Sequence, residues 1–201
     1  TILFGDCRET LKEFDGKART CVTSPPYYGL RDYGGEDKQI GQEESPEEYI
    51  QNLVEVFRSV RDVLTDDGTL WVNIGDSYYN YRPGKGQALP KQSVSKTKQD
   101  LPDKCAKRGN KLQGLKEKDL IGIPWMLAFA LRADGWYLRQ DIIWHKPNPM
   151  PESVKDRCTK SHEYIFLLSK NRKYYYNNEA IKEPVKQDWG TRDRTKGKYH
   201  N

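Results

Sequence analysis

The chain has 201 residues, of which 35% are hydrophobic and 31% charged, with a formal net charge of +5. This length suits one α/β domain with its own core and excludes two large domains, while the balance of apolar and charged residues excludes a fully disordered chain. The sequence has no apolar run of about 18 residues and no signal-peptide pattern, so we expect a cytosolic protein without a membrane segment.

The first predicted unit is a strand, a helix and a second strand. β-branched residues followed by two prolines indicate the first strand. Ser45, a proline and a glutamate at capping-box spacing indicate the start of the helix, and apolar residues then recur at helical spacing. The expected ranges are 18–23 for the first strand, 45–64 for the helix, 66–68 for a turn and 69–74 for a buried second strand.

The second predicted unit repeats this order. Pro124 opens a helix, Asp134 and Gly135 form a turn, and a strand follows. Two apolar or aromatic runs near the end of the chain suggest a β-hairpin. The expected ranges are 123–133 for the helix, 136–144 for the strand, and 163–168 with 173–176 for the hairpin. The alternation predicts an α/β fold whose mostly parallel sheet is covered on both faces, with an antiparallel hairpin at its edge.

Charge is distributed unevenly along the chain. Residues 1–78 carry 8 basic and 16 acidic side chains, residues 79–118 carry 11 and 3, residues 119–169 carry 6 and 6, and residues 170–201 carry 9 and 4. The two positive segments suit a polyanionic partner, although lysine-rich loops also serve solubility alone. Residues 79–118 lack an apolar period, which favours a mobile loop that orders on nucleic acid or a disordered insertion without a role.

Cysteine and histidine spacing argues against a metal site or a disulfide framework. The cysteines never approach a CxxC spacing, and the histidines form no pair that places two imidazoles on one helix face. We therefore expect free thiols and no protein metal site. The residues concerned are Cys7, Cys21, Cys105 and Cys158, and His145, His162 and His200.

Ser24, Pro25, Pro26 and Tyr27 follow the first predicted strand and have a specific chemical use. An exocyclic amine on a planar base is a weak nucleophile, because its lone pair is delocalised into the ring. Ser24 Oγ and the Pro25 carbonyl would accept the two amine N–H groups, while the prolines stiffen the turn. Tyr27 would stack on a base extruded from the duplex. Alone, Pro-Pro-Tyr also fits a polyproline turn or a peptide ligand.

Together with this motif, other segments occur in the order found in the β-arrangement DNA amino-methyltransferases, which the chain resembles. The resemblance implies a Rossmann-like fold, S-adenosylmethionine as cofactor and double-stranded DNA as partner. It also implies direct in-line methyl transfer to an exocyclic amine of a flipped base, as in restriction–modification. The matching segments are residues 5–7, 23–34, the Ser45-capped helix, 67–78, 144–151 and 161–170.

The resemblance implies roles at matching positions. Asp6 resembles the acidic contact to the adenine amine of the cofactor, with Cys7 and Ser24 as further cofactor-binding candidates, while a helix N-cap is the alternative for Asp6. Lys146 resembles a residue lining the target-base or phosphate channel and is otherwise a solvated lysine. The candidate DNA contacts are Tyr27, Arg31, Lys146, Arg157 and Lys160.

Three other polar residues lie near predicted strand ends. Asp76 either shapes the cleft or is an acidic turn residue. His162 and Glu163 could suggest an acid–base pair, but methyl transfer requires no strong base, so we expect a structural role for them.

The sequence departs from the family at the cofactor loop. A Phe-x-Gly-x-Gly segment should follow the catalytic motif, yet none follows Glu179, and Gly84 and Gly86 lie in a polar run that does not replace it. We therefore expect one of three explanations: the chain is a fragment, a homodimer or a second polypeptide supplies the loop, or the chain no longer catalyses. We expect residues 1–201 to form the catalytic part of one methyltransferase domain, with 79–118 a basic mobile insert and 179–201 the start of a recognition region or tail.

Two classes of function remain open. The leading hypothesis is a bacterial or phage DNA methyltransferase, with cytosine N4 favoured because Ser24 resembles that subgroup and adenine N6 as the alternative. The second is a DNA-binding module without catalysis.

Overall fold

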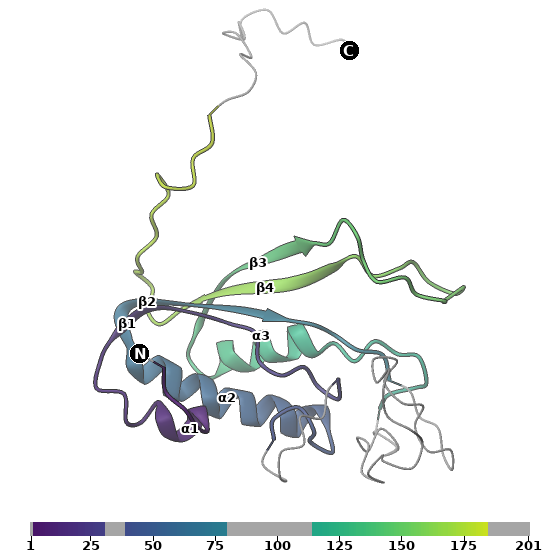
Figure 1. The fold of residues 1–201 in the computed structure, drawn as a ribbon, viewed down its shortest axis with the longest axis horizontal. Coiled ribbons are helices and arrows are strands. Elements are labelled where there is room, and N and C mark those ends of the chain that lie inside the picture. The colour runs from purple at the N-terminus through teal and green to yellow at the C-terminus, as the bar shows by residue number, and fades with distance from the viewer. Residues whose placement is uncertain (1, 31–38, 80–113, 185–201) are drawn as a thin grey trace, which may run out of the picture.

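A computed structural model describes residues 2–30, 39–79 and 114–184, in which four strands form one mixed sheet (Figure 1). The strand order is β1-β2-β4-β3. β1 and β2 are parallel, and β4 is antiparallel to both β2 and β3. β3 therefore runs in the direction of β1 and β2, as expected for an α/β fold. The strands are β1 (Ala18–Thr23), β2 (Leu64–Ile74), β3 (Tyr137–His145) and β4 (His162–Ser169).

Three helices, α1 (Cys7–Thr10), α2 (Pro46–Val63) and α3 (Ile123–Ala133), lie on one side of the sheet (Figure 1). The Glu48 backbone N–H donates to Ser45 Oγ at 3.1 Å, which confirms the predicted cap of α2. No helix within the described ranges is long and apolar enough to cross a membrane.

The core lies between these helices and the sheet. Tyr49, Leu53 and Phe57 of α2 are fully buried, as are Leu70 and Val72 of β2. Because successive strand residues face opposite sides, the intervening β2 residues face away from the helices. One face of the sheet thus packs apolar side chains against the helices, and the other face lies on the opposite side of the sheet.

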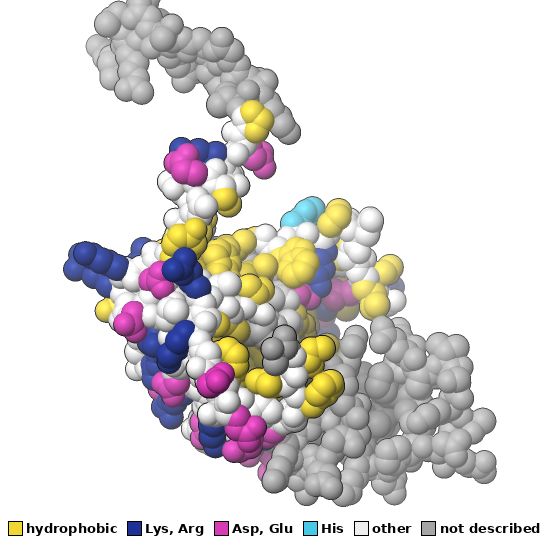
Figure 2. All heavy atoms as spheres, turned by 60° about the vertical axis from the view of Figure 1, so that its left-hand side comes forward, with side chains coloured by type: hydrophobic (Ala, Val, Ile, Leu, Met, Phe, Trp, Pro, Cys, Tyr) yellow, Lys and Arg dark blue, Asp and Glu magenta, His cyan; other side chains and the backbone are white. Residues whose placement is uncertain are grey.

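The second face of the sheet is partly bare. Val22 is 76% exposed and Trp144 is 52% exposed. Figure 2 shows hydrophobic side chains gathered on the side away from the helices, where the segment after β4 leaves the sheet. No helix among residues 2–30, 39–79 and 114–184 covers this face, so the expectation of helices on both faces is wrong for the described chain.

The predicted edge hairpin does not form, because β4 already pairs along both of its edges, with β2 and with β3. The residues after β4 turn toward the start of β2 instead. The Asn171 side-chain amide donates to the Asp66 carbonyl at 2.8 Å, and the Tyr175 backbone N–H donates to the Asp67 carbonyl at 2.9 Å. Residues 173–176 are therefore not a strand beside β4.

β2 also begins earlier than predicted. It starts at Leu64 directly after α2 and includes residues 66–68, which the sequence indicated as a turn. The irregularity is absorbed in the pairing with β1, whose register shifts between Ala18 and Thr20. Because Ala18 pairs with Leu64 and Thr20 with Thr69, the Asp-Asp-Gly segment lies in an irregularity of β2 between two paired positions.

The two ends of the predicted basic insert lie side by side. The Tyr79 N–H donates to the Asp119 carbonyl at 2.8 Å, and the Lys118 N–H donates to the Tyr79 carbonyl at 2.9 Å. Residues 80–113 of the insert and 185–201 of the predicted tail lie outside the described residues. The proposed domain divisions therefore remain predictions.

Candidate active site

Ser24 lies immediately beyond β1, at the edge of the sheet where the parallel strands end. The Tyr49 hydroxyl, from the buried face of α2, donates to the Pro26 carbonyl at 2.7 Å. Pro25 is buried, and its carbonyl accepts no hydrogen bond from another described residue, whereas Ser24 is exposed. The turn is thus held from the helical side, while Ser24 Oγ and the Pro25 carbonyl remain as acceptors of the predicted kind.

Tyr27 turns its hydroxyl back toward the sheet. Its oxygen lies 2.8 Å from Asn73 Oδ1 and 3.0 Å from Glu163 Oε2, and its single hydrogen can serve one of these acceptors at a time. The ring also lies against Gly75, where an added Cβ would stand 2.6 Å from Tyr27 Cε2. Both the hydroxyl and one edge of the ring are therefore fixed, and stacking on a base remains a prediction.

Asn73 orients the polar groups around Ser24. Its side-chain nitrogen donates to the Tyr164 carbonyl at 3.2 Å, which turns its oxygen toward Tyr27 and Ser24. Ser24 Oγ lies 3.5 Å from this oxygen and 3.4 Å from the Tyr27 hydroxyl. Because these two contacts are long, Ser24 is only weakly engaged and can accept a hydrogen bond from a substrate.

Glu163 and Lys146 complete the cluster from the other two strands. The Lys146 ammonium pairs with Glu163 Oε1, while Glu163 Oε2 faces the Tyr27 hydroxyl. The Lys146 backbone N–H donates to the Ser161 carbonyl at 2.7 Å, which holds the start of the β3–β4 loop closed. The structure thus brings predicted residues Ser24, Tyr27 and Lys146 into one cluster, joined through Asn73 and Glu163.

Burial and hydrogen bonding fix the protonation of this cluster. Burial, assisted by the Glu163 carboxylate, raises the pKa of Tyr27 to about 12, so the phenol stays neutral at physiological pH. Burial disfavours the ionised form of Glu163, but hydrogen bonds from Lys146, Tyr27 and Asn73 outweigh it and hold the pKa of Glu163 below its usual range. The carboxylate is therefore an anion that accepts hydrogen bonds from these three neighbours.

Asp6 and Cys7 lie at α1, which packs against α2. Asp6 caps α1 by accepting from the Arg8 backbone N–H at 2.9 Å, and its carboxylate also pairs with the Arg8 guanidinium at 2.6 Å. The alternative assignment of Asp6 as an N-cap is thus observed, while the cofactor contact remains a prediction. Burial, and then the Asp6 charge, raises the pKa of the Cys7 thiol.

The candidate phosphate contacts are held on the β3–β4 loop. The Arg157 guanidinium lies 4.1 Å from the Tyr78 ring centroid and pairs with Glu152 at 2.6 Å. The Lys160 backbone N–H approaches the same Glu152 carboxylate at 3.4 Å. Arg31 lies outside the described residues. The roles of Arg31, Arg157 and Lys160 in DNA binding remain predictions.

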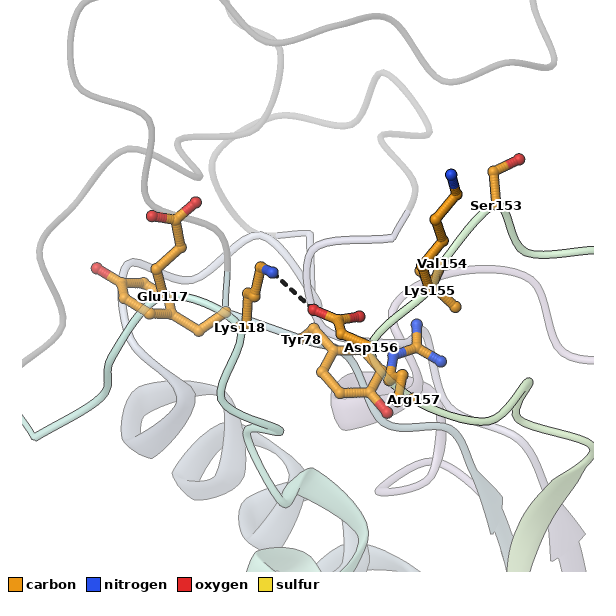
Figure 3. A pocket seen from close by; sticks show the side chains of 9 residues that line it. Tyr78, Glu117, Lys118, Ser153, Val154, Lys155, Asp156 and Arg157 are labelled. Atoms are coloured by element: carbon orange, nitrogen blue, oxygen red, sulfur yellow. Dashed lines mark hydrogen bonds and ion pairs between the residues drawn. The ribbon is translucent and has the colours of Figure 1, made fainter.

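A cleft of about 980 Å³ lies between the β2–α3 connection and the β3–β4 loop (Figure 3). The Lys118 ammonium points across it to the Asp156 carboxylate, at 2.6 Å. Both basic and acidic side chains line it, so its charge has no dominant sign. The lining residues are Tyr78, Tyr79, Glu117, Lys118 and residues 153–157.

Asp76 has a structural role at the start of α3. Its carboxylate accepts from the backbone N–H groups of Ser77 at 2.9 Å, Gly122 at 3.0 Å and Ile123 at 3.1 Å. Gly122, the residue at the N-cap position, has no side chain to serve this purpose. Asp76 therefore fastens α3 to the end of β2 and is more than an acidic turn residue.

Three residues of the site were missed by the sequence analysis. Asn73 and Gly75 were noted only as parts of a predicted strand or a matching segment, and Glu163 was assigned a structural role. All three are polar or glycine residues near the beginning or end of an apolar run. Such a residue indicates the end of a strand, but it does not indicate which strand ends lie side by side in the sheet.

Within residues 2–30, 39–79 and 114–184, no group of three or more His, Cys, Asp or Glu side chains is placed to hold a metal ion. Cys7, Cys21 and Cys158 are free thiols, and Cys105 lies outside the described residues.

The sequence is similar to a known protein family and to several of its members. The family model N6_N4_Mtase, described as DNA methylase, matches residues 18–201. The chain belongs to this DNA methylase family. Type II methyltransferase M.SmaI of Serratia marcescens is 55% identical over 190 residues, covering 92% of this chain and 60% of that protein. Type II methyltransferase M.Cfr9I of Citrobacter freundii is 52% identical, covering 96% and 62%. The chain thus spans about three-fifths of the length of these relatives.

Solved structures confirm the fold of this family member. The cytosine-N4-specific PvuII DNA methyltransferase matches with a TM-score of 0.55 at 18% identity, covering 85% of this chain and 49% of that one. A protein of Thermus thermophilus, solved in complex with S-adenosyl-L-methionine, matches with a TM-score of 0.52 at 21% identity, covering 88% and 55%. The predicted Rossmann-like methyltransferase fold is therefore confirmed.

Proposed function

We propose that the protein transfers a methyl group from S-adenosylmethionine to an exocyclic amine of a flipped DNA base, in the cytoplasm. The observation that carries this proposal is the position of Ser24, exposed at the sheet edge and only weakly engaged by Asn73 and Tyr27. Ligands of open α/β sheets bind outside the carboxyl ends of the strands, which is where this residue lies. Family membership and the type II methyltransferase relatives add support.

The chain's own residues would orient the amine. Ser24 Oγ and the Pro25 carbonyl would accept its two N–H groups and draw the nitrogen out of conjugation with the ring. S-adenosylmethionine, when bound, supplies the methyl group as a sulfonium. The amine lone pair would form the new nitrogen–carbon bond as the carbon–sulfur bond breaks, so the cofactor would leave as an uncharged thioether, and the methylated amine would pass one proton to water. The stiff proline turn, fixed by Tyr49, keeps both acceptors aligned without reorganisation.

Cytosine N4 is the favoured target and adenine N6 the alternative. Both bases present an amine beside a ring nitrogen, so the same acceptors suit either. Ser24 resembles the cytosine-N4 subgroup at this position. Nucleoside analysis of DNA modified by the active protein gives the answer, and N6-methyladenine without N4-methylcytosine would reject the favoured target.

We also propose that further polypeptide, in the same or a second chain, supplies the cofactor loop and packs on the bare face of the sheet. Val22 and Trp144 are more than half exposed there, and β1 has a free edge within the described residues. Such apolar exposure favours a covering partner. Asp6, Cys7 and Ser24 would bind the cofactor together with that loop, and Asp6 would first have to share its carboxylate with a ligand other than Arg8.

The test uses a completed protein, meaning this chain together with the polypeptide that carries the cofactor loop. That polypeptide can be taken from the part of the Serratia marcescens relative that this chain does not match. It can be fused to the chain or added as a second chain. Transfer of tritiated methyl groups to duplex DNA should require both parts and should be lost with Ser24→Ala. Full activity of Ser24→Ala would contradict the proposal, and activity of the chain alone as a dimer would contradict the second-polypeptide arrangement.

A DNA-binding module without catalysis is the second candidate, favoured by the three-fifths coverage of the relatives. Calorimetric titration with S-adenosylmethionine separates the two. If the completed protein binds DNA in a salt-dependent manner but does not bind the cofactor, the module is supported. In either case, the logarithm of the DNA-binding constant should fall linearly with the logarithm of the salt concentration. If Arg31, Arg157 or Lys160 contacts a phosphate, neutralising that residue should lower the size of this salt slope by about one.

A further inference from the structure

We propose that Glu163 is a positioning residue whose two carboxylate oxygens hold Tyr27 and Lys146 beside Ser24, so that Lys146 faces the target base rather than a phosphate. This inference rests on the proposed function and deepens it. It gives Glu163, for which the sequence predicted a structural role, a role in positioning. It also places Lys146 in the target-base channel rather than in the phosphate channel.

The sheet topology brings Glu163 to this position. β4 runs against its neighbours, so its first residues lie where β2 and β3 end. Trp144 at the end of β3 pairs with Glu163, and Ile74 at the end of β2 pairs with Tyr164. Glu163 therefore stands between the segment after β2, with Gly75, and the segment after β3, with Lys146.

The two contacts of Glu163 are specific to its two oxygens. Oε2 lies 3.0 Å from the Tyr27 hydroxyl, and Oε1 pairs with the Lys146 ammonium. The Glu163 side chain is 18% exposed, whereas that of Lys146 is 42% exposed. The carboxylate is thus the inner member of the pair, and the more exposed lysine keeps N–H donors that Glu163 does not use.

This charge balance disfavours a phosphate role for Lys146. Moving the ammonium to a phosphate would leave the partly buried Glu163 carboxylate without its cation. A lysine that is already neutralised also releases few counterions on binding DNA. A base edge, by contrast, needs only one N–H donor toward a ring nitrogen next to the amine, and the pair can provide it without separating.

A purely structural Lys146–Glu163 ion pair would have different effects when it is removed. It would change the stability of the fold without separating turnover from binding. A positioning pair changes the turnover number, leaves the affinity for DNA unchanged, and behaves as one unit with its partner. Residues that act as a unit are non-additive in a double-mutant cycle.

The experiment compares Glu163→Gln, Lys146→Met and the double variant in the completed protein. Each single variant should lower kcat by roughly 10- to 100-fold, as expected when an aligned group is released, with KM for DNA within about threefold of wild type. The double variant should be no more than about threefold slower than the slower single variant. The salt slope of DNA binding should not change with Lys146→Met, whereas a phosphate contact would lower it by about one.

Asp67→Asn is the matched control. It removes a carboxylate that pairs with Arg19 at 3.5 Å, near the start of β1 and far along the strand from Ser24. Its kcat should stay within about twofold of wild type, because an exposed pair contributes little stability and this one lies away from Ser24. Additive losses in the double variant, a salt slope reduced by one, or unchanged kcat in Glu163→Gln would each overturn the positioning role.

A second readout does not depend on activity. Tyrosinate formation in this chain is followed by ultraviolet absorbance as the pH is raised. The titration curve of Tyr27→Phe is subtracted from that of the wild type, and the difference, which belongs to Tyr27, should have its midpoint near pH 12. In a Glu163→Gln background the same difference should titrate at lower pH, because the opposing carboxylate is gone. An unchanged midpoint would overturn the contact. An inactive wild-type completed protein with the expected shift would count against the proposed function and leave the contact standing.

Discussion

Gly75 is the position where the smallest substitution should disturb the site most. In Gly75→Ala the new Cβ would lie 2.6 Å from Tyr27 Cε2 and 2.9 Å from Tyr27 Cδ2. Gly75 does not have a left-handed backbone, so the cost comes from the clash rather than from strain at residue 75. The ring must retreat by about 0.8 Å to reach the closest ordinary carbon contact of about 3.4 Å.

That movement is large on the scale of the hydrogen bonds it affects. The Tyr27 hydroxyl is 2.8 Å from Asn73 and 3.0 Å from Glu163. A displacement of about 0.8 Å along either bond would lengthen it beyond the usual limit for hydrogen bonding. Overpacking of this kind costs roughly 1–3 kcal/mol of unfolding free energy, and misplacement by about 1 Å can slow catalysis by about 100-fold.

The assay is a double-mutant cycle with Tyr27→Ala. Urea unfolding of the 201-residue chain, followed by tryptophan fluorescence, measures stability, and methyl transfer by the completed protein measures activity. Gly75→Ala should destabilise the wild type but have little effect once the Tyr27 ring is removed, giving a coupling of roughly 1–2 kcal/mol. An equal loss of stability in both backgrounds, or wild-type activity in Gly75→Ala, would refute the packing argument.

Three further predictions concern the supports of the site. Asp76→Ala should lower the free energy of unfolding by about 1–2 kcal/mol in urea titrations, because it removes the cap of α3, whereas Asp76→Asn should retain most of it. Tyr49→Phe should cost about 1–2 kcal/mol, because it leaves the Pro26 carbonyl without a donor, and methyl transfer should fall as the turn loosens; unchanged values of both would contradict the support. The unfolded chain should ionise Tyr27 near pH 10 and the folded chain near pH 12, so the stability that Tyr27 contributes should be complete below about pH 10 and lost as the pH rises toward 12. Unfolding midpoints of wild type and Tyr27→Phe across this range check the sign, since the wild type alone should show this additional loss.

Local signals were sufficient to predict most elements. The Ser45 cap and the helical spacing after it defined α2 to within a residue or so, and β1 ends where the proline pair begins. These features depend on residues close in sequence. The hairpin prediction used the same kind of signal and was wrong, because a short polar segment does not reveal that both edges of β4 are occupied.

The site was predictable only in part for the same reason. Ser24 and Tyr27 belong to one short motif, and Lys146 belongs to a second segment of the family pattern. Glu163 joins them only through the register of β4 against β2 and β3, which depends on pairings across large sequence separations. Hydrophobic periodicity places a residue on a face but does not name its neighbour on the next strand.

The antiparallel strand explains how one sheet edge acquires so varied a set of groups. Parallel strands bring only their carboxyl ends to an edge, and here those ends contribute Ser24 after β1, Gly75 after β2 and Lys146 after β3. β4 runs the other way and adds its beginning, with Glu163, to the same edge. An anion between a phenol and an ammonium is thereby placed next to a weakly engaged serine hydroxyl. Replacing β4 by a parallel strand would remove that anion and leave the Lys146 ammonium without its partner, which would favour a phosphate at this edge.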